Sequence, residues 1–236
     1  MTLRMIATTL LILIGSASWA QMPVSQKPSD NAITFYSKEF TEIINRLQLQ
    51  HDTTYSLGGI PVSDDCVSMM NANQTTGKVG EAIFKELTTK ADLYSLLLEG
   101  GDVKRYCKKY SGMSKNQRAL VWVLILTTMA HFESSCSEKA SARGPNGTAY
   151  GYYQLHKGKE DQYLGGDACA KNSSTNPVSS SRCTLAMLEI QMKRSNRMLF
   201  SNKSYWEVLR PNGPADKAKL ITKALMVSTL CNPTTM

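Results

Sequence analysis

The chain has 236 residues, of which 42% are hydrophobic and 19% are charged, and its formal net charge is +8 at pH 7. This length and apolar content suit a single domain with a sizeable core, or one domain with an elaborated end. The positive charge favours anionic partners such as membrane surfaces or wall polymers, although a soluble basic protein without such a partner explains the charge equally well.

Residues 1–20 have the layout of a secretory signal peptide. Arg4 precedes an apolar run over Met5–Ile14, and Ser18-Trp19-Ala20 provides a small-x-small cleavage pattern. The run is too short and wrongly flanked for a membrane-spanning helix, so a retained anchor is the weaker alternative. Cleavage after Ala20 removes one basic residue, and the remaining 26 basic and 19 acidic residues give +7. We therefore expect a secreted or periplasmic protein that does not bind nucleic acid.

Six cysteines, at positions 66, 107, 136, 169, 183 and 231, predict three disulfides in an exported protein. The pairing Cys169–Cys183 is favoured because it would close the polar loop Asn172–Ser181. Cys66–Cys107 is a weaker expectation, and Cys136–Cys231 would follow by elimination. The sequence has no CxxC pair and no second ligand cluster, so we expect neither a zinc site nor a cofactor.

Residues 21–112 are expected to form an N-terminal helical region. It comprises a proline-containing tail over residues 21–32 and helices that begin at Ser37, at about Val79 and at Asp102. The helix from Val79 is predicted to continue to Leu98, where Gly100-Gly101 ends it.

The most informative segment begins at Ser114. Ser114 and Gln117 fit a capping box, and the run from Ala119 to Leu126 that follows them is apolar on every side. Such a helix is buried all round at the centre of a helical domain. It would cover about 20 residues, roughly 30 Å, and end with His131-Phe132-Glu133-Ser134-Ser135. No stable membrane insertion is expected, because polar residues interrupt the run at Thr127, Thr128 and His131.

Residues 136–158 break the helical pattern. Gly144-Pro145-Asn146-Gly147 is followed by Gly151-Tyr152-Tyr153-Gln154-Leu155, which predicts a loop and a small β-hairpin. Helical periodicity returns over Cys183–Met198 and near Ala215–Leu230. The expected fold is mainly α with one small hairpin, and residues 113–236 form its core domain.

Glu133 is in an unusual place, in the last turn of the buried helix. The negative end of the helix dipole and partial desolvation beside Phe132 both raise the pKa of a carboxyl group. A general acid that protonates a glycosidic oxygen needs a raised pKa, because it must hold its proton at neutral pH. The alternative is an exposed glutamate on a fraying helix end.

Glu133-Ser134, followed by the stretch Gly147–Leu155, resembles the signature of the lytic transglycosylases and goose-type lysozymes. In that family a Glu-Ser at the end of a central buried helix precedes a glycine-rich stretch that ends in Gly-Leu-Met-Gln, where this chain has Gly-Tyr-Tyr-Gln. The 18 positions from Glu133 to Gly151 are nearer to the goose-type spacing. The resemblance covers residues 114–160. It implies a lysozyme-like helical domain, with a hairpin beside the cleft, that cleaves the glycan strands of peptidoglycan.

The resemblance also implies roles for individual residues. Glu133 would be the catalytic acid, and Ser134 would position the glycan or the carboxyl group. Gly147 and Gly151 would let the backbone approach a sugar closely. Tyr205 corresponds, on weaker grounds, to a tyrosine that the family places near the cleft.

An extended segment over Tyr150–Leu155 would place Tyr150, Tyr152 and Gln154 on one face. Gln154 could then bind sugar hydroxyl or acetamido groups, and the tyrosines could stack on pyranose rings. Ordinary core packing explains the tyrosines equally well.

The reaction type depends on a second carboxylate. A hydrolase typically pairs its acid with one, whereas a lytic transglycosylase, as the family implies, uses a single glutamate and lets the muramic 6-hydroxyl close a 1,6-anhydro ring. Candidate partners are Glu160, Asp161 and Asp167, which solvated loop charges would explain equally well. The goose-type spacing and the expected disulfides favour hydrolysis. Glu160 or Asp161 could also bind the ammonium groups of N-deacetylated glycan.

Two other classes of function compete. A non-catalytic wall-binding or inhibitor protein would be expected to lack the acid, yet Glu133 and Gln154 are both present. A metallo-amidase or endopeptidase is disfavoured because none of the histidines, at 51, 131 and 156, has HExxH spacing. His131 is expected to be a satisfied core residue. We expect a monomer that acts on peptidoglycan glycan strands.

Overall fold

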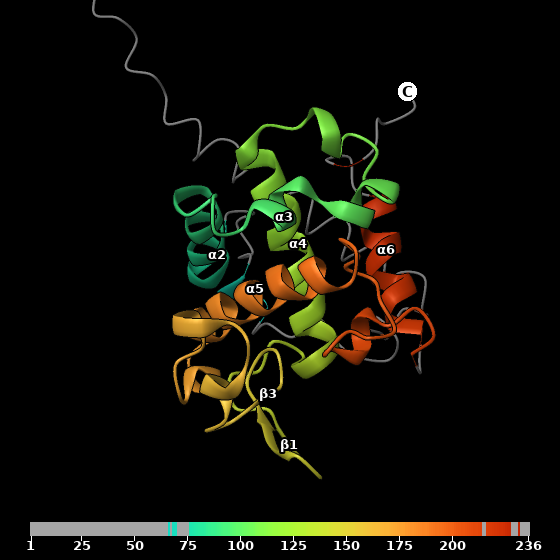
Figure 1. Cartoon of the computed structure of the whole chain (residues 1–236). Helices are drawn as coiled ribbons and strands as arrows, with labels where there is room; N and C mark the ends of the chain where they lie inside the picture. Colours follow the sequence, from blue (N-terminus) through green and yellow to red (C-terminus); the bar gives the residue numbers. More distant parts are fainter. Residues whose placement is uncertain (1–65, 67, 70–75, 214–215, 228–230, 232–236) are drawn as a thin grey trace, which may run out of the picture.

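A computed structural model describes residues 66, 68–69, 76–213, 216–227 and 231, and all structural statements below refer to these residues. The expected signal peptide, the tail over residues 21–32 and the helix from Ser37 lie outside them. The main helices, numbered as in Figure 1, are α2 (Lys78–Thr89), α3 (Ser95–Glu99), α4 (Lys115–Ser134), α5 (Pro177–Arg194) and α6 (Lys217–Val227).

Helix α4 runs through the middle of the molecule, and its C-terminal end lies next to the small sheet (Figure 1). Every residue from Ala119 to Phe132 is buried. The predicted capping box is present, because the Gln117 amide donates to Ser114 Oγ and the Ser114 amide donates to Gln117 Oε1. Helices α2, α3 and α6 pack against α4. The prediction of a central helix buried on all sides is therefore confirmed. Among the described helices, none combines the length and hydropathy needed to cross a bilayer.

The helix predicted over Val79–Leu98 is divided into α2 and α3. The Thr89 hydroxyl donates to the Lys85 carbonyl at the end of α2, which stops at this residue. A new helix then begins because the Glu189 carboxylate, which belongs to α5, accepts the main-chain N–H groups of Leu96 and Leu97, both at 2.9 Å. A carboxylate at these free N–H groups stabilises a helix start. This contact comes from a distant part of the chain, so local periodicity did not reveal it.

Gly100 ends α3, as predicted. Its φ of 91° is left-handed, and a Cβ atom at this position would lie 2.3 Å from the Tyr110 ring. The single helix expected over Asp102–Tyr110 is instead two short 3-10 helices, η2 (Gly101–Arg105) and η3 (Tyr110–Gly112). The buried Asp102 carboxylate accepts the amide of Leu199 at 2.7 Å, so tertiary contacts shape this segment too.

Three short strands form an antiparallel sheet in the order β1-β2-β3. They are β1 (Ser141–Gly144), β2 (Gly147–Tyr150) and β3 (Leu155–His156). Ser141 pairs with Tyr150 and Gly144 pairs with Gly147, which confirms the predicted small hairpin. The chain is thus mainly helical with one small sheet, as the sequence predicted.

Three disulfides connect the described segments. Cys169–Cys183 is present, as predicted. The other two are Cys66–Cys136 and Cys107–Cys231, so the expected pairs Cys66–Cys107 and Cys136–Cys231 are wrong. Cysteine spacing could not decide this, because the end of α4 brings residue 136 to residue 66 and the chain after α6 returns to residue 107. Such disulfides are typical of extracellular or periplasmic proteins.

Candidate active site

Glu133 is held at the closed end of α4. Ser135 adopts a left-handed conformation with φ 53°, and its amide donates to the His131 carbonyl at 2.9 Å. The Cys136 amide donates to the Ala130 carbonyl at 3.2 Å. The disulfide from Cys136 to Cys66 anchors the chain immediately after the helix. This helix end is therefore closed by backbone hydrogen bonds and a covalent link, and does not fray.

The Glu133 side chain is partly buried, and its environment favours the protonated form. Burial raises the pKa of Glu133 from 4.5 to about 7. Lys217, at the start of α6, acts in the opposite direction, and the negative charge of Glu207 raises the pKa further. At neutral pH the group is thus close to half protonated, so it can donate a proton and take one back.

The turn between β2 and β3 is fastened to the end of α4. The Ser134 hydroxyl donates to the carbonyls of Ala130 and Tyr152, both at 3.0 Å. Gln154 Nε2 donates to the carbonyls of Gly151 and Ala140, at 2.9 and 3.2 Å. The donor groups of Ser134 and Gln154 are engaged with the main chain. Both residues therefore position the turn beside Glu133, and a sugar could use only their acceptor oxygens.

The expected extended segment over Tyr150–Leu155 is wrong, because residues 151–154 form a turn in which Gly151 has φ 70° and Gln154 has φ 50°. Consequently Tyr152 points into the core and is only 1% exposed, so it cannot stack on a sugar ring. A Cβ at Gly151 would lie 2.3 Å from the Ser174 carbonyl oxygen. Gly147 adopts φ 128° at the hairpin turn. Contacts and turns within the protein itself account for both glycines.

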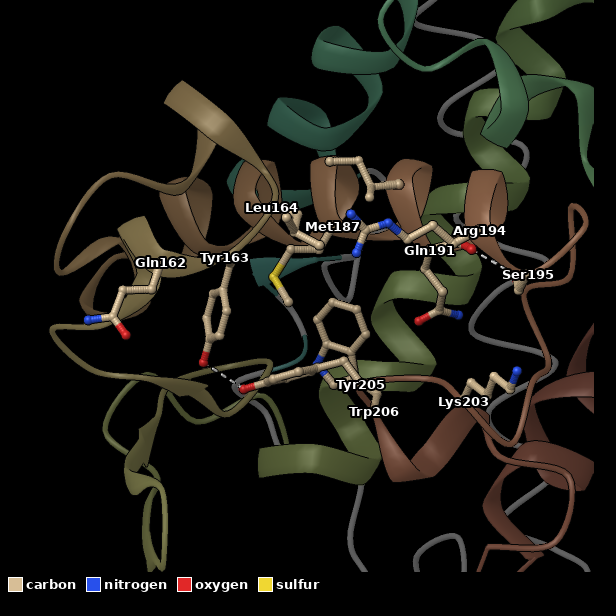
Figure 2. A pocket seen from close by; sticks show the side chains of 11 residues that line it. Gln162, Tyr163, Leu164, Met187, Gln191, Arg194, Ser195, Lys203, Tyr205 and Trp206 are labelled. Atoms are coloured by element: carbon tan, nitrogen blue, oxygen red, sulfur yellow. Dashed lines mark hydrogen bonds between the residues drawn. The ribbon is translucent and has the colours of Figure 1, made fainter.

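Tyr205 belongs to a cluster of hydrogen-bonded rings, here called the Tyr–His cluster, which comprises His156, Tyr163 and Tyr205. The hydroxyls of Tyr163 and Tyr205 are 2.9 Å apart (Figure 2). His156 Nδ1 lies 2.7 Å from the Tyr163 hydroxyl and 3.1 Å from that of Tyr205. Burial and the adjacent Tyr163 raise the pKa of Tyr205, and the charge of Glu133 raises it further. The Tyr205 hydroxyl also donates to the Gln154 carbonyl at 3.5 Å, so the cluster contacts the turn that Ser134 fastens to the end of α4.

Sequence reasoning identified Tyr205 but missed Tyr163 and the contact that His156 makes with both tyrosines. Tyr163 follows the motif by nine positions without a pattern of its own. The only available signal for His156 was its place two residues after Gln154.

Glu160 is not a second catalytic carboxylate. It is completely buried, and it accepts hydrogen bonds from the amides of Gly158, Asn172 and Ser174 and from the Ser174 hydroxyl. Burial raises the pKa of Glu160, but these hydrogen bonds outweigh burial and the net shift is downward. This ionised group organises the surrounding loop. The expectation that it faces substrate is wrong, because all its acceptor capacity is directed inward.

Glu207 is the carboxylate whose charge acts on Glu133. It opens the short 3-10 helix η7 (Glu207–Leu209), which packs against α4 and α6, and its side chain is exposed. The sequence signal was its position two residues after Tyr205. Asp161 and Asp167 are both exposed, and a role for Asp161 stays a prediction.

Two pockets flank the segment that contains Tyr205 and Glu207. The first, here called the α5 pocket, has a volume of about 420 Å³ and lies between α5 and Lys203–Trp206 (Figure 2). The second, of about 430 Å³, is lined by Asn202, Glu207, Arg210, Asn212 and Gly213. Glu133 lines neither pocket, but its charge raises the pKa of Tyr205, which lines the first, and the charge of Glu207, which lines the second, raises the pKa of Glu133. Within the described ranges, no cluster of three His, Cys, Asp or Glu side chains could hold a metal ion.

His131 is buried, as predicted, and is 2% exposed. Burial lowers its pKa to about 4, so its ring is neutral at physiological pH. Neither ring nitrogen has a hydrogen-bond partner among the residues that the structure describes, which differs from the expected satisfied histidine. A neutral, enclosed ring does not serve as the acid or base of a surface site.

Glu133 should titrate near pH 7, and its two charged neighbours should move this value in opposite directions. Glu207→Gln removes a negative charge and should lower the pKa of Glu133, whereas Lys217→Gln removes a positive charge and should raise it. Carboxyl-carbon NMR titration of the labelled protein measures both shifts. Glu138→Gln, at an exposed glutamate five positions away, serves as the charge-matched control. Equal titration curves in all variants would contradict the assigned effects of Glu207 and Lys217 on the pKa of Glu133.

Comparison with known proteins supports the fold class, which is mainly helical. No protein-family model matches this chain, and no curated protein sequence matches it. Solved structures do share its mainly helical architecture. One is DslA (Bd0314) in its wild-type form, with a TM-score of 0.55 and 21% identity over 66% of this chain and 91% of that chain. Two variants of DslA, each with one glutamate replaced by glutamine, match with TM-scores of 0.55 and 0.54 at 22% and 20% identity. At this identity the similarity is one of fold.

Proposed function

We propose that this protein cleaves the glycan strands of peptidoglycan at the β-1,4 bond between N-acetylmuramic acid and N-acetylglucosamine, with Glu133 as general acid. The observation that carries the proposal is a partly buried carboxyl group at the closed end of α4 whose pKa is raised to about 7. The Glu-Ser and Gly-Tyr-Tyr-Gln motifs support it, since Ser134 joins the two segments that carry them.

The proposed reaction begins with proton transfer from Glu133 to the glycosidic oxygen. The leaving sugar departs, and positive charge develops on the remaining muramyl ring. Tyr205, held by the Tyr–His cluster, would form one wall beside the ring. Water then attacks, and we assign Glu207, whose charge acts on Glu133, as the carboxylate that accepts the proton of this water. Hydrolysis is therefore the favoured outcome.

Transglycosylation is the alternative outcome of the same first step. The muramic 6-hydroxyl would attack in place of water and close a 1,6-anhydro ring, without a second carboxylate. Mass spectrometry of digested sacculi separates the two, because anhydro ends are lighter by one water than reducing ends. Reducing ends are expected. Anhydro ends alone would contradict hydrolysis and retain the role of Glu133, whereas intact strands would contradict glycan cleavage altogether.

A preference for N-deacetylated strands would need an acidic side chain beside the scissile bond, since deacetylation exposes ammonium groups. Glu160 does not meet this requirement, because it is buried and fully hydrogen-bonded. Glu207 is an exposed carboxylate whose charge acts on Glu133, and it lines the second pocket together with Arg210. We propose it as the determinant of such a preference. Equal turnover of acetylated and deacetylated sacculi would dispose of this idea.

Export to the periplasm or the cell exterior is part of the proposal, since the substrate lies there. The layout of residues 1–20 and the three disulfides support it. A non-catalytic wall-binding protein is the competing proposal. It predicts that purified protein binds sacculi without releasing soluble fragments.

A further inference from the structure

We infer that the α5 pocket binds the peptide stem of the muramic acid residue whose glycan strand lies at Glu133. This inference rests on the proposed function and adds a second recognition element to it. The pocket is a separate concavity from the carboxyl group itself, and no catalytic step proposed above uses it.

The walls of the pocket are apolar. They include Leu164, which is 54% exposed, together with Met187 of α5 and the buried Trp206. An exposed leucine beside a concave apolar surface is suited to contact with small alkyl groups. Alanine methyl groups, which are abundant in wall peptides, have this chemistry.

Both charged groups of the pocket are cationic. Gln191 is already engaged, because its Nε2 donates to the Leu199 carbonyl and its Oε1 accepts from Ser204. The Ser195 hydroxyl donates to main-chain carbonyls, one of which belongs to Met198. These side chains therefore hold the pocket in shape and have little capacity left for a ligand.

Arg194, Lys203 and Gln162 remain, all exposed, and none of the 11 lining residues is acidic. Figure 2 shows the Arg194 side chain extending over the pocket near Met187, with Lys203 on the opposite side of the opening from Tyr163. Two cations around an apolar floor select an anion that also carries apolar groups. The carboxylates and methyl groups of a peptide stem combine both features, whereas N-acetylglucosamine carries no charge.

Tyr205 connects this pocket with the candidate acid. Its ring lines the pocket, and its hydroxyl donates to the Gln154 carbonyl at 3.5 Å, in the turn that Ser134, the residue next to Glu133, holds through the Tyr152 carbonyl. A substituent on a sugar bound beside Glu133 would reach the pocket past the Tyr205 ring. The stem is attached to muramic acid through its lactyl group, so it projects from the strand at the required sugar.

The test compares glycan strands that carry stems with strands from which an amidase has removed them. For wild type, kcat/KM should be about 10-fold higher on stem-bearing strands, as expected for a few exposed charge contacts. In the double variant Arg194→Gln, Lys203→Gln this ratio should fall to about 1. Lys193→Gln is the control for the Arg194 change, because it removes one positive charge from the adjacent position of α5, outside the pocket lining. It should keep the wild-type ratio.

Binding separates failure of this inference from failure of the proposed function. Calorimetry in a Glu133→Gln background, with a soluble muramyl peptide as probe, should show binding that weakens about 10-fold in the double variant. This binding measurement tests the inference even if the protein cleaves neither stem-bearing nor stem-free strands. Equal affinity for stem-bearing and stem-free strands would overturn the inference, as would an equal effect of Lys193→Gln. Binding of a phosphate-bearing wall polymer in preference to the muramyl peptide would also overturn it.

Discussion

Glu133→Gln is expected to abolish the clearing of purified sacculi, with a loss of roughly 1,000-fold in kcat, because general acid catalysis contributes about 100- to 10,000-fold. Glutamine has the same shape but no proton to transfer at any pH between 4 and 9. The loss should appear in kcat, and strand binding should persist. Turbidity loss of sacculi measures it, with Glu138→Gln as the exposed control.

The same substitution should stabilise the protein at high pH, which distinguishes a functional glutamate from a structural one. The carboxyl group ionises near pH 4.5 in the unfolded chain and near pH 7 in the native state. The native state therefore holds an extra proton between these values, and its stability falls as pH rises through this window. Above pH 7, Glu133→Gln should raise the free energy of unfolding by about 2 kcal/mol, allowing for partial exposure.

Two observations would contradict this assignment. If Glu133→Gln clears sacculi as fast as wild type, the enzyme proposal fails at this residue. If the variant is less stable than wild type above pH 7, the carboxylate makes favourable native contacts and its environment does not favour protonation. Urea unfolding at pH 5 and pH 8.5 decides the second point, because the stabilisation should be large only at the higher pH.

The second large effect concerns stability. Removing the Cys107–Cys231 disulfide by replacing both cysteines with serine should lower the free energy of unfolding by about 5 kcal/mol in the chain-entropy model. The bond joins residues 124 positions apart and holds the chain after α6 to the segment between η2 and η3. Removing Cys169–Cys183, whose cysteines are 14 positions apart, should lower it by only about 3 kcal/mol.

Denaturant unfolding without reductant, followed by fluorescence, measures both losses. The order of the two losses is the decisive test, because both variants change two cysteines to serine and differ only in the disulfide removed. A larger loss from the Cys169–Cys183 pair would contradict it, and would mean that local packing of the loop over residues 169–183 outweighs loop closure.

Elements with a strong local cause were predictable. The central helix was evident because Ser114 and Gln117 cap its start and an unbroken apolar run follows. The hairpin was evident from Gly144-Pro145-Asn146-Gly147, which now forms the tight turn between β1 and β2. The raised pKa of Glu133 followed from its place at the end of a buried helix, and burial is indeed its main cause.

Elements with a distant cause were not predictable. Tyr152 faces the core because residues 151–154 form a turn that places its side chain inside. The prediction assumed the alternating side-chain directions of a strand, and the sequence pattern did not reveal the turn. Glu160 appeared as a loop charge beside the motif, yet donors from Gly158, Asn172 and Ser174 converge on it only after the loop has folded. The other carboxylate, Glu207, approaches Glu133 across 74 positions of sequence.

The amino-acid sequence by itself determined which helix is central, which carboxyl group ends it and where the hairpin turns, because capping, apolar runs and turn chemistry act over a few residues. Only the tertiary structure decided the partners of Cys66 and Cys107, the restart of α3 on Glu189, and the assembly of the Tyr–His cluster beside Glu133. These contacts join segments far apart in the chain. Their free energy appears only when packing has brought those segments together.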